Sequence, residues 1–530
     1  MAATFTREGI AELVASAMRF PPTAGQMEAI DALSRFIIRF REPVGFVLSG
    51  YAGTGKTTLV GALTAALSRL NIQTVLLAPT GRAAKVMGGY AGRPAYTIHK
   101  YIYYTGLDES GFLRTSLRKN KLSQTLFIVD EASMMNEDEG LLSDLMTFVY
   151  TGYRCRLLFV GDRAQLPPVG SSYSPALEVD FLNRHFAHLD VDFTETRLTE
   201  VLRQAASSLI LSNATYLRQR LLQDDFTLPV FDLTGRGTGL DNGDGAPGVE
   251  PDKVGSPESS CKVSANENVV FDLPNRSRTS HERSEGKTSV GALVKKDLFQ
   301  LKGEDFEDTL QSVYGCSARE DVVFITRSNK RANLFNKAIR ERVFGLEEEV
   351  SAGDLLMVVR NNYYWTEQME KIGFLANGDM IEVLKVRQYK DLYGFRFADI
   401  EARLTDYPDE PPLELKICLD CLHVEGPSLS YAQNRQLWDE VMLDYAHLRT
   451  KAERVAAVKK DPYVNALQVK YAYALTCHKT QGGQWPTVFV DLGYFTDDML
   501  EADFFRWLYT ALTRAEDRLY LVGFDEKWMF

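Results

Sequence analysis

The sequence predicts an α/β fold built on parallel sheets, and two observations support this prediction. Between Val44 and Asp162, short continuous apolar runs alternate with helical stretches. Such runs are typical of strands in a parallel sheet whose two faces are both covered by helices. The same alternation returns near Leu298 and again after Ala472, on either side of a stretch that alternates apolar and polar residues. We therefore expect two α/β domains, the second interrupted by a small antiparallel β module.

Each predicted strand of the first domain ends in polar or glycine-containing residues. The strands are expected at Val44–Gly50, Thr74–Thr80, Leu126–Ala132 and Cys155–Asp162, with a helix from Lys56. Open α/β sheets bind ligands at the carboxyl ends of their strands, so these ends are the candidate site.

The expected domain boundaries follow from shifts in composition along the chain. Residues 235–286 are rich in Gly, Pro, Ser, Asn and charged residues, a composition that cannot offset the entropy of ordering. We expect domain one at 1–228 with a β-hairpin at about 101–124, a flexible insertion at 229–292, domain two at 293–352 and 466–530, and the β module with a helical extension at 353–465.

Whole-chain composition excludes some classes of protein. The 530 residues include 60 Lys and Arg against 71 Asp and Glu, a net charge of −11, which argues against a uniformly basic nucleic-acid coat but permits a local basic groove. Six cysteines make no disulfide scaffold. No signal peptide or apolar run of about 18 residues is evident, so we expect a cytoplasmic protein with no membrane partner.

The segment from Gly50 to Thr57 matches the phosphate-binding pattern G-x-x-x-x-G-K-[ST]. Glycines let backbone N–H groups turn toward phosphates, Lys56 would reach the β- and γ-phosphates, and the Thr57 hydroxyl would ligate Mg²⁺. The expected nucleotide-binding residues here are Gly50, Gly53, Thr54, Gly55, Lys56, Thr57 and Thr58.

Asp130 and Glu131 follow the strand that begins at Leu126. One strand-end carboxylate can hold Mg²⁺, and the next can orient or deprotonate attacking water. The alternative is an acidic helix N-terminus, which the neighbouring phosphate loop disfavours. A guanine site would need N-K-x-D, and Asn329-Lys330-Arg331-Ala332 lacks the Asp, so ATP is the expected nucleotide.

The order of motifs along the chain resembles the superfamily 1 helicases, in the RecD/Dda-like branch that moves 5′ to 3′ on single-stranded DNA. The resemblance rests on PTAGQMEAI around Gln26, the phosphate loop, LLAPTGRAAKVM (76–87), TIHK (97–100), VGDRAQLPPVG (160–170), LTEVLRQ (198–204), ALTCHKTQGGQW (474–485) and YTALTRA (509–515). It implies two RecA-like motor domains with an SH3-like module in the second. The polar insertion departs from the family pattern.

The resemblance also implies roles for individual residues. Gln26 would read adenine, and Thr57 and Asp130 would hold Mg²⁺. The catalytic set would be Lys56, Asp130, Glu131, Gln165 as γ-phosphate sensor, and Arg203 and Arg514 as two arginine fingers. Residues expected to contact DNA are Pro79, Thr80, Arg82, Lys85, Thr97, His99, Lys100, Thr476, His478, Lys479 and Gln481. For the two histidines, a structural role is the alternative.

The basic stretch Arg327–Arg342 is either a solvated helix face or a DNA-facing surface. The expected activity is ATP-driven 5′→3′ translocation on single-stranded DNA with unwinding of duplexes that carry a 5′ tail, by a monomer using ATP and Mg²⁺. The hairpin would help to split the duplex. An RNA-directed helicase and an ATP-switched nucleic-acid-binding adaptor are the alternatives.

Overall fold

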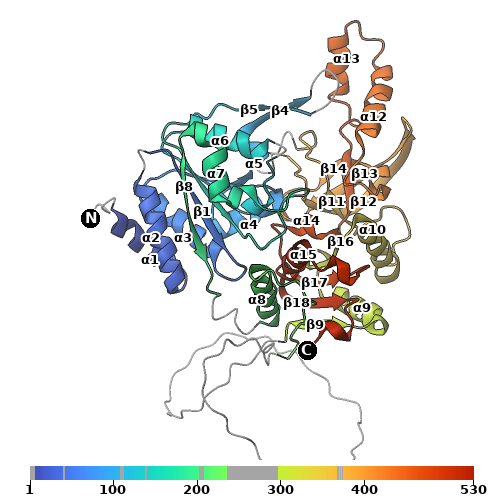
Figure 1. Ribbon diagram of the computed structural model, residues 1–530. Helices are drawn as coiled ribbons and strands as arrows, with labels where there is room; N and C mark the ends of the chain where they lie inside the picture. The colour runs from blue at the N-terminus through green and yellow to red at the C-terminus, as the bar shows by residue number, and fades with distance from the viewer. Residues whose placement is uncertain are drawn as a thin grey trace, which may run out of the picture.

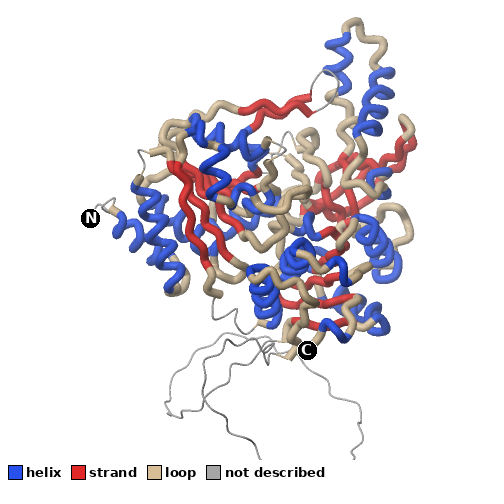
Figure 2. The backbone as a smooth tube through the Cα atoms, in the orientation of Figure 1, coloured by secondary structure: helices blue, strands red, loops and turns tan. Residues whose placement is uncertain are grey.

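The protein is described by a computed structural model that covers residues 6–39, 42–107, 113–137, 140–201, 208–234, 296–366, 369, 372 and 374–530. The expected flexible insertion lies, from residue 235 on, outside these ranges, and so does Arg203. The described chain forms two α/β units and a closed β barrel (Figures 1 and 2).

The first unit is built on a six-stranded sheet in which every pairing is parallel. In sheet order its strands are β3 (Ala95–Thr97), β2 (Thr74–Ala78), β6 (Leu126–Val129), β7 (Arg156–Gly161), β1 (Val44–Gly50) and β8 (Asp192–Leu198). Its helices are α1 (Arg7–Ala17), α2 (Ala24–Ile38), α3 (Lys56–Arg69), α4 (Gly81–Ala91), α5 (Ile98–Ile102), α6 (Leu141–Thr151) and α7 (Val179–His185). The expected parallel sheet is confirmed.

Helices cover both faces of this sheet. One apolar cluster joins the strands to α1, α2 and α3, and another joins them to α5, α6 and α7. All residues of β1 are buried, which accounts for its continuous apolar sequence. Because the strands are parallel, the phosphate loop after β1, Thr80 after β2 and Asp130 after β6 lie at one edge of the sheet. The antiparallel hairpin β4 (Tyr103–Leu107) and β5 (Leu113–Leu117) extends from the unit at its expected position.

The second unit has a five-stranded parallel sheet. In sheet order the strands are β16 (Ala474–Thr476), β10 (Val322–Thr326), β17 (Trp485–Asp491), β18 (Ala515–Val522) and β9 (Leu298–Leu301). Its helices are α8 (Leu209–Leu222), α9 (Phe306–Cys316), α10 (Asn329–Ala338), α14 (Cys477–Thr480) and α15 (Ala502–Leu512), and a π-helical turn, Ile339–Val343, follows α10. Throughout the described ranges, no helix is long and apolar enough to cross a bilayer.

Helix α8 differs from the expected boundary at residue 228. Its apolar residues Leu209, Ile210 and Leu217 belong to the core of the second unit, and the helix packs beside α15 (Figure 1). The elements of the first unit therefore end with β8. An amphipathic helix shows in sequence which face is buried, but not which of two neighbouring units buries it.

The inserted module is a closed barrel of five strands: β11 (Leu355–Val358), β12 (Met380–Leu392), β13 (Phe395–Leu404), β14 (Leu413–Cys418) and β15 (Leu467–Tyr471). Its pairings are antiparallel except for β14 with β15. Strand β15 lies beyond the expected end of the module at residue 465. The helices α11 (Asp420–His423), α12 (Tyr431–Asp444) and α13 (Lys451–Val458) separate β14 from β15, and α12 and α13 project away from the barrel (Figure 1).

Candidate nucleotide and nucleic-acid site

The phosphate loop joins β1 to α3 with two glycines in the left-handed region. Gly53 has a φ of 76° and Gly55, the N-cap of α3, a φ of 81°. Residues with a Cβ rarely adopt this conformation, which explains glycine at both positions. The Lys56 ammonium donates to the carbonyl oxygens of Gly50 (2.7 Å) and Tyr51 (2.9 Å). The lysine is thus held against the loop at the amino end of α3, where an anion is favoured.

Gln26 supports the same loop from α2. Its amide nitrogen donates to the carbonyl oxygen of Thr54 (3.0 Å), and its amide oxygen accepts from the backbone N–H of Thr23 (3.1 Å). The second bond completes a capping box at the start of α2. Gln26 is therefore placed beside the phosphate loop, with both ends of its carboxamide already hydrogen-bonded.

Asp130 and Glu131 come directly after β6, at the same sheet edge as the loop. Burial, and next the neighbouring charge of Glu131, raise the pKa of Asp130 to about 7. Its carboxylate accepts the backbone N–H of Glu131 (2.9 Å). Glu131 has a φ of 52°, an unfavourable conformation for a residue with a side chain, and such strain is concentrated at functional sites. The charge of the nearby Lys56 acts in the opposite direction and lowers the pKa of Asp130.

The segment after β7 carries Gln165, the expected γ-phosphate sensor. Its side chain is buried, and its amide oxygen Oε1 has no hydrogen-bond partner among the described residues. A buried acceptor without a donor is costly, and a water molecule can supply the missing donor. The first residue of the segment, Asp162, is also buried and accepts the backbone N–H of Ala164 (2.9 Å).

Arg514 follows α15 in the second unit, at the interface with the first. Its guanidinium is buried and donates to the carbonyl oxygens of Thr510 (3.0 Å) and Gly483 (3.1 Å) and to the hydroxyl of Thr513 (3.2 Å). These acceptors are uncharged, so they orient the guanidinium without neutralising it. Five residues earlier on α15, the Tyr509 hydroxyl accepts the backbone N–H of Ala52 in the phosphate loop (2.9 Å).

The expected DNA-contact residues of the first unit lie after β2 and β3. Thr80 and Thr97 cap α4 and α5 and lie beside Pro79 and His99. Arg82 and Lys85 extend from α4, and Lys100 extends from α5.

The cations of α4 and α5 face the barrel and the second unit in this structure. Arg82 stacks 3.8 Å from the ring centre of Trp485 and donates to the carbonyl oxygen of Gln484 (3.1 Å). Lys85 pairs with Asp406 (3.2 Å). Burial lowers the pKa of Arg82 to about 10 and that of Lys85 to about 8.

A buried barrel carboxylate, Asp379, lies against the start of α4. A Cβ on Gly81 would come within 2.7 Å of its Oδ1 atom, which shows how closely the barrel approaches. Burial raises the pKa of Asp379 to about 6, while the nearby cations Lys85 and Lys100 lower it. Lys100 also donates to the carbonyl oxygen of Ile372 (3.4 Å). The barrel thus covers the cations that were expected to bind DNA.

On the second unit, the expected DNA-contact residues surround α14. Thr476 caps the helix and lines a small groove with Lys479, whose pKa burial lowers to about 8. His478 is exposed. The carboxamide of Gln481 points elsewhere: it is buried and donates to the carbonyl oxygen of Leu166 in the first unit (2.7 Å). In this conformation Gln481 joins the two units and is not available to DNA.

Two family profiles and several known proteins match parts of this chain. A family profile described as an AAA domain matches residues 24–220, and one described as a UvrD-like helicase C-terminal domain matches residues 471–522. The chain is 36% identical over 168 residues to the ATP-dependent RecD2 DNA helicase of Deinococcus radiodurans, a match that covers 32% of this chain and 21% of the relative. It is 30% identical over 199 residues to the ATP-dependent DNA helicase dda of Enterobacteria phage T4, covering 37% and 42%.

In these segments the chain is similar to the RecD2 and Dda DNA helicases. It spans less than half the length of either of these curated relatives. Among solved structures, the chain is similar to a Bacteroides Pif1 helicase in complex with ADP-AlF3 and ssDNA, with a TM-score of 0.45, 14% identity, and coverage of 96% of this chain and 94% of that one.

The basic stretch Arg327–Arg342 is largely occupied by ion pairs. Arg331 pairs with the buried Asp491 (2.5 Å), and Arg340 pairs with the buried Asp354 (2.7 Å). Lys337 pairs with Glu341 and Arg342 with Glu307. These contacts favour a structural role for much of the stretch over a continuous DNA-facing surface.

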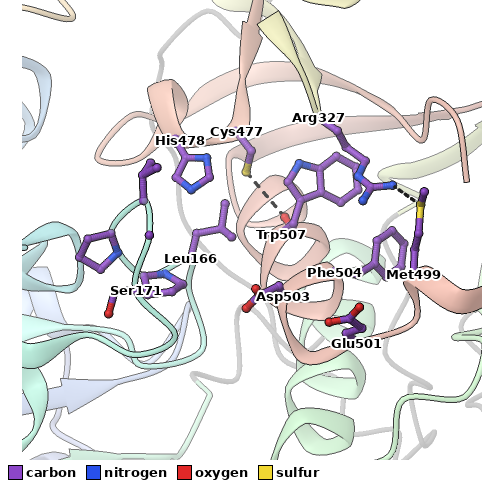
Figure 3. Close-up of a pocket in the computed structure, with 14 residues that line it drawn as sticks. Leu166, Ser171, Arg327, Cys477, His478, Met499, Glu501, Asp503, Phe504 and Trp507 are labelled. Atoms are coloured by element: carbon purple, nitrogen blue, oxygen red, sulfur yellow. Dashed lines mark hydrogen bonds between the residues drawn. The ribbon is translucent and has the colours of Figure 1, made fainter. Parts of the chain in front are cut away.

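A pocket of about 440 Å³ lies between residues 166–171 and the amino-terminal half of α15 (Figure 3). Arg327 packs over the rings of Phe504 (5.4 Å) and Trp507 (5.7 Å) on one side, and His478 lies on the other. Glu501 and Asp503 also line the pocket. These carboxylates disfavour phosphate here, so the strand backbone is expected to bind elsewhere.

Tyr509 and Asp162 lie in motifs that the sequence shows, but neither residue was expected to have a role in the site. The Tyr509 hydroxyl donates to Asp162 Oδ2 (2.6 Å), and both side chains are buried. The signal was present, because Tyr509 lies in YTALTRA and Asp162 lies in VGDRAQ, two segments that resemble superfamily 1 helicase motifs. Their contact depends on how the two units pack, which the sequence does not state.

Proposed function

We propose that the chain is an ATP-dependent DNA helicase that couples ATP hydrolysis to 5′→3′ movement on single-stranded DNA and to duplex unwinding. The observation that carries this proposal is the contact between the units: α15, which leads to Arg514, touches the phosphate loop of the first unit through Tyr509 and Ala52. When two units share a site, the geometry of that site changes as the units move relative to each other. A motor requires this coupling between its ATP site and the movement of its domains.

The residues after β1 and β6 fit a magnesium nucleotide. The Thr57 hydroxyl and the Asp130 carboxylate are oxygen donors of the kind that Mg²⁺ binds. Bound there, Mg²⁺ would neutralise phosphate charge. Lys56 would bind the terminal phosphates, Glu131 would accept the proton of the attacking water, and Gln165 Oε1 would orient that water.

Two arginines would complete the site. We assign Arg514 as the finger from the second unit, and Arg203, outside the described residues, as the other. Gln26 would position the loop and adjoin the adenine. The two α/β units would be RecA-like motor domains, one ending before α8 and the other containing it, and the barrel would be an SH3-like module.

Single-stranded DNA would follow the edge marked by Pro79, Thr80 and Thr97, with His99, and then the groove of Thr476 and Lys479. The exposed His478 would contact the strand beside this groove, at the rim of the neighbouring pocket. Hydroxyl and backbone donors hold phosphates without reading sequence. Arg82, Lys85 and Lys100 contact the barrel or the second unit in this structure, so DNA binding requires the barrel to shift. We call this row of residues the DNA track. The acidic total charge of the chain is consistent with DNA binding that is confined to the track.

Lys85→Ala tests the track. Each phosphate contact on a single strand contributes about 0.7 to the slope of log affinity against log salt. We expect the variant to bind oligo(dT) and mixed-sequence strands several-fold more weakly, with a slope smaller by about 0.7. Fluorescence anisotropy between low and moderate salt measures both. Lys527→Ala, an exposed lysine in the last helical turn, is the matched control, and an unchanged slope in Lys85→Ala would remove this residue from the track.

The two alternatives predict different stimulation of ATP hydrolysis. A DNA helicase should be stimulated many-fold by single-stranded DNA and weakly by RNA of the same length, whereas an RNA-directed enzyme should show the reverse. An adaptor would bind DNA with no matching rise in turnover. The decisive experiment is steady-state ATPase activity without nucleic acid, with oligo(dT) and with oligo(U); absence of DNA stimulation would overturn the proposal.

A further inference from the structure

A buried hydroxyl connects the two halves of the candidate ATP site. Tyr509 on α15 is 1% exposed, and its hydroxyl accepts the N–H of Ala52 and donates to Asp162 Oδ2. Ala52 belongs to the phosphate loop, and Asp162 begins the segment that carries Gln165. One side chain from the second unit therefore bonds to two separate catalytic segments of the first.

The local electrostatics keep this hydroxyl in the form that makes both bonds. Burial, and next the negative charge of Asp162, raise the pKa of Tyr509 well above its usual value. The hydroxyl therefore keeps its proton at neutral pH, so it donates and accepts at once. Beside it, the Arg218 guanidinium lies 3.5 Å from the ring centre of Tyr51 in the phosphate loop.

The same segment of the first unit receives two more bonds from the second. The Thr510 hydroxyl accepts the N–H of Leu166 (2.8 Å), and Gln481 donates to the carbonyl oxygen of Leu166 (2.7 Å). Gln165 thus lies between Asp162 and Leu166, which are both bonded to side chains of the second unit. Gln481 belongs to the segment that also holds Thr476 and His478. Its bond to Leu166 therefore connects the expected DNA-binding segment to the residue next to Gln165, the expected γ-phosphate sensor.

We propose that Tyr509 is a positioning residue that transmits DNA binding on the second unit to ATP hydrolysis on the first. The proposal rests on the proposed ATPase function. Arg514 lies five residues further along the chain, just after α15 ends at Leu512. Fixing Tyr509 against Ala52 and Asp162 therefore sets where Arg514 and Gln165 stand relative to the phosphates. Tyr509 acts through these residues and is not itself catalytic.

Tyr509→Phe removes the hydroxyl and keeps the ring. We expect the DNA-stimulated kcat to fall by about 10- to 100-fold, because the buried Asp162 carboxylate loses one of its two donors and the backbone N–H of Ala52 loses its acceptor. The KM for ATP should change by less than about threefold, because the loop and Lys56 are retained. The unstimulated rate should fall much less, so the ratio of stimulated to unstimulated turnover should collapse. A merely structural role would lower both rates together.

The matched control is Tyr445→Phe. It removes a hydroxyl that also donates to an aspartate, Asp461 (3.0 Å), but in the helical extension of the barrel. Its stimulated rate should equal that of the unsubstituted chain. Circular dichroism melts of all variants report whether they fold.

A second variant, Asp162→Ala, keeps the proposal testable if Tyr509→Phe does not fold. It should reproduce the loss of stimulation, and the double variant should be no worse than the more affected single one, since both single variants remove the hydrogen bond between Tyr509 and Asp162. Full stimulation in Tyr509→Phe, in Asp162→Ala, or additive losses in the double variant would overturn the positioning role. If the unsubstituted chain itself shows no DNA-stimulated hydrolysis, the proposed function fails instead.

Discussion

Replacing Arg514 with alanine is expected to lower kcat for DNA-stimulated ATP hydrolysis by about 10³–10⁵-fold, or roughly 4–7 kcal/mol of transition-state stabilisation. Arg514 is 4% exposed, and its guanidinium donates only to uncharged acceptors, so these partners do not neutralise its charge. Steady-state turnover at saturating ATP and oligo(dT) measures the loss.

Two further substitutions make the Arg514 result specific. Arg514→Lys keeps the charge but loses the planar fork, so it should restore only part of the activity. Arg518→Ala, an exposed arginine on β18, should leave turnover unchanged. If Arg514→Ala folds and retains kcat within tenfold of the unsubstituted chain, Arg514 is not the finger.

Lys56→Ala is expected to lower kcat/KM for ATP by about 10²–10³-fold or more, the cost of removing one preorganised electrostatic donor. In the structure its ammonium is held by the carbonyl oxygens of Gly50 and Tyr51 at the start of α3, so phosphates entering the loop would meet it directly. DNA binding should be partly kept, because the expected track lies after β2 and β3.

Kinetics and nucleotide binding together check the Lys56 prediction. Fluorescent-nucleotide titration measures the loss of affinity, and oligo(dT) anisotropy measures the DNA binding that remains. Lys302→Ala, a largely exposed lysine after β9, serves as the control for removing a charge. Undiminished hydrolysis in Lys56→Ala would refute the nucleotide site.

The parts of the site that depend on local sequence were predicted correctly in position. The phosphate loop requires a strand, two glycines in the left-handed region and a following helix, and all of these are encoded between Val44 and Arg69. Asp130 and Glu131 were likewise expected after a buried strand, and they lie there. In such segments the secondary-structure propensity, the turn-forming residues and the pattern of burial all predict the same local structure.

The parts that depend on contacts between distant segments were not predicted. Strand β15 closes the barrel by pairing with β11 and with β14, more than a hundred and about fifty residues earlier in the chain, and its sequence does not show this. Helix α8 is amphipathic whichever unit it joins. Gln481 lies in a DNA-contact motif, but its carboxamide bonds to Leu166 because the units pack closely there. These contacts depend on tertiary packing, which no local sequence pattern specifies.

The barrel covers residues that were expected to contact DNA, and the sequence did not predict this. Arg82 and Lys85 were expected to face DNA, yet the turn at Asp379 and residues Asp406 and Tyr407 lie against them. Their lowered pKa values reflect this burial. The proposed track therefore becomes available only when the barrel shifts, and strand binding and barrel position are linked equilibria.

The central claim is directional movement on DNA driven by ATP, and strand displacement tests it most directly. Duplexes of identical sequence carrying a single-stranded tail on the 5′ end, the 3′ end or neither are mixed with the protein, ATP and Mg²⁺, and release of a labelled strand is followed. We predict rapid release from the 5′-tailed duplex, at least tenfold slower release from the other two, and none with Lys56→Ala. Equal or faster release from the 3′-tailed duplex, or no release despite DNA-stimulated ATP hydrolysis, would contradict the account.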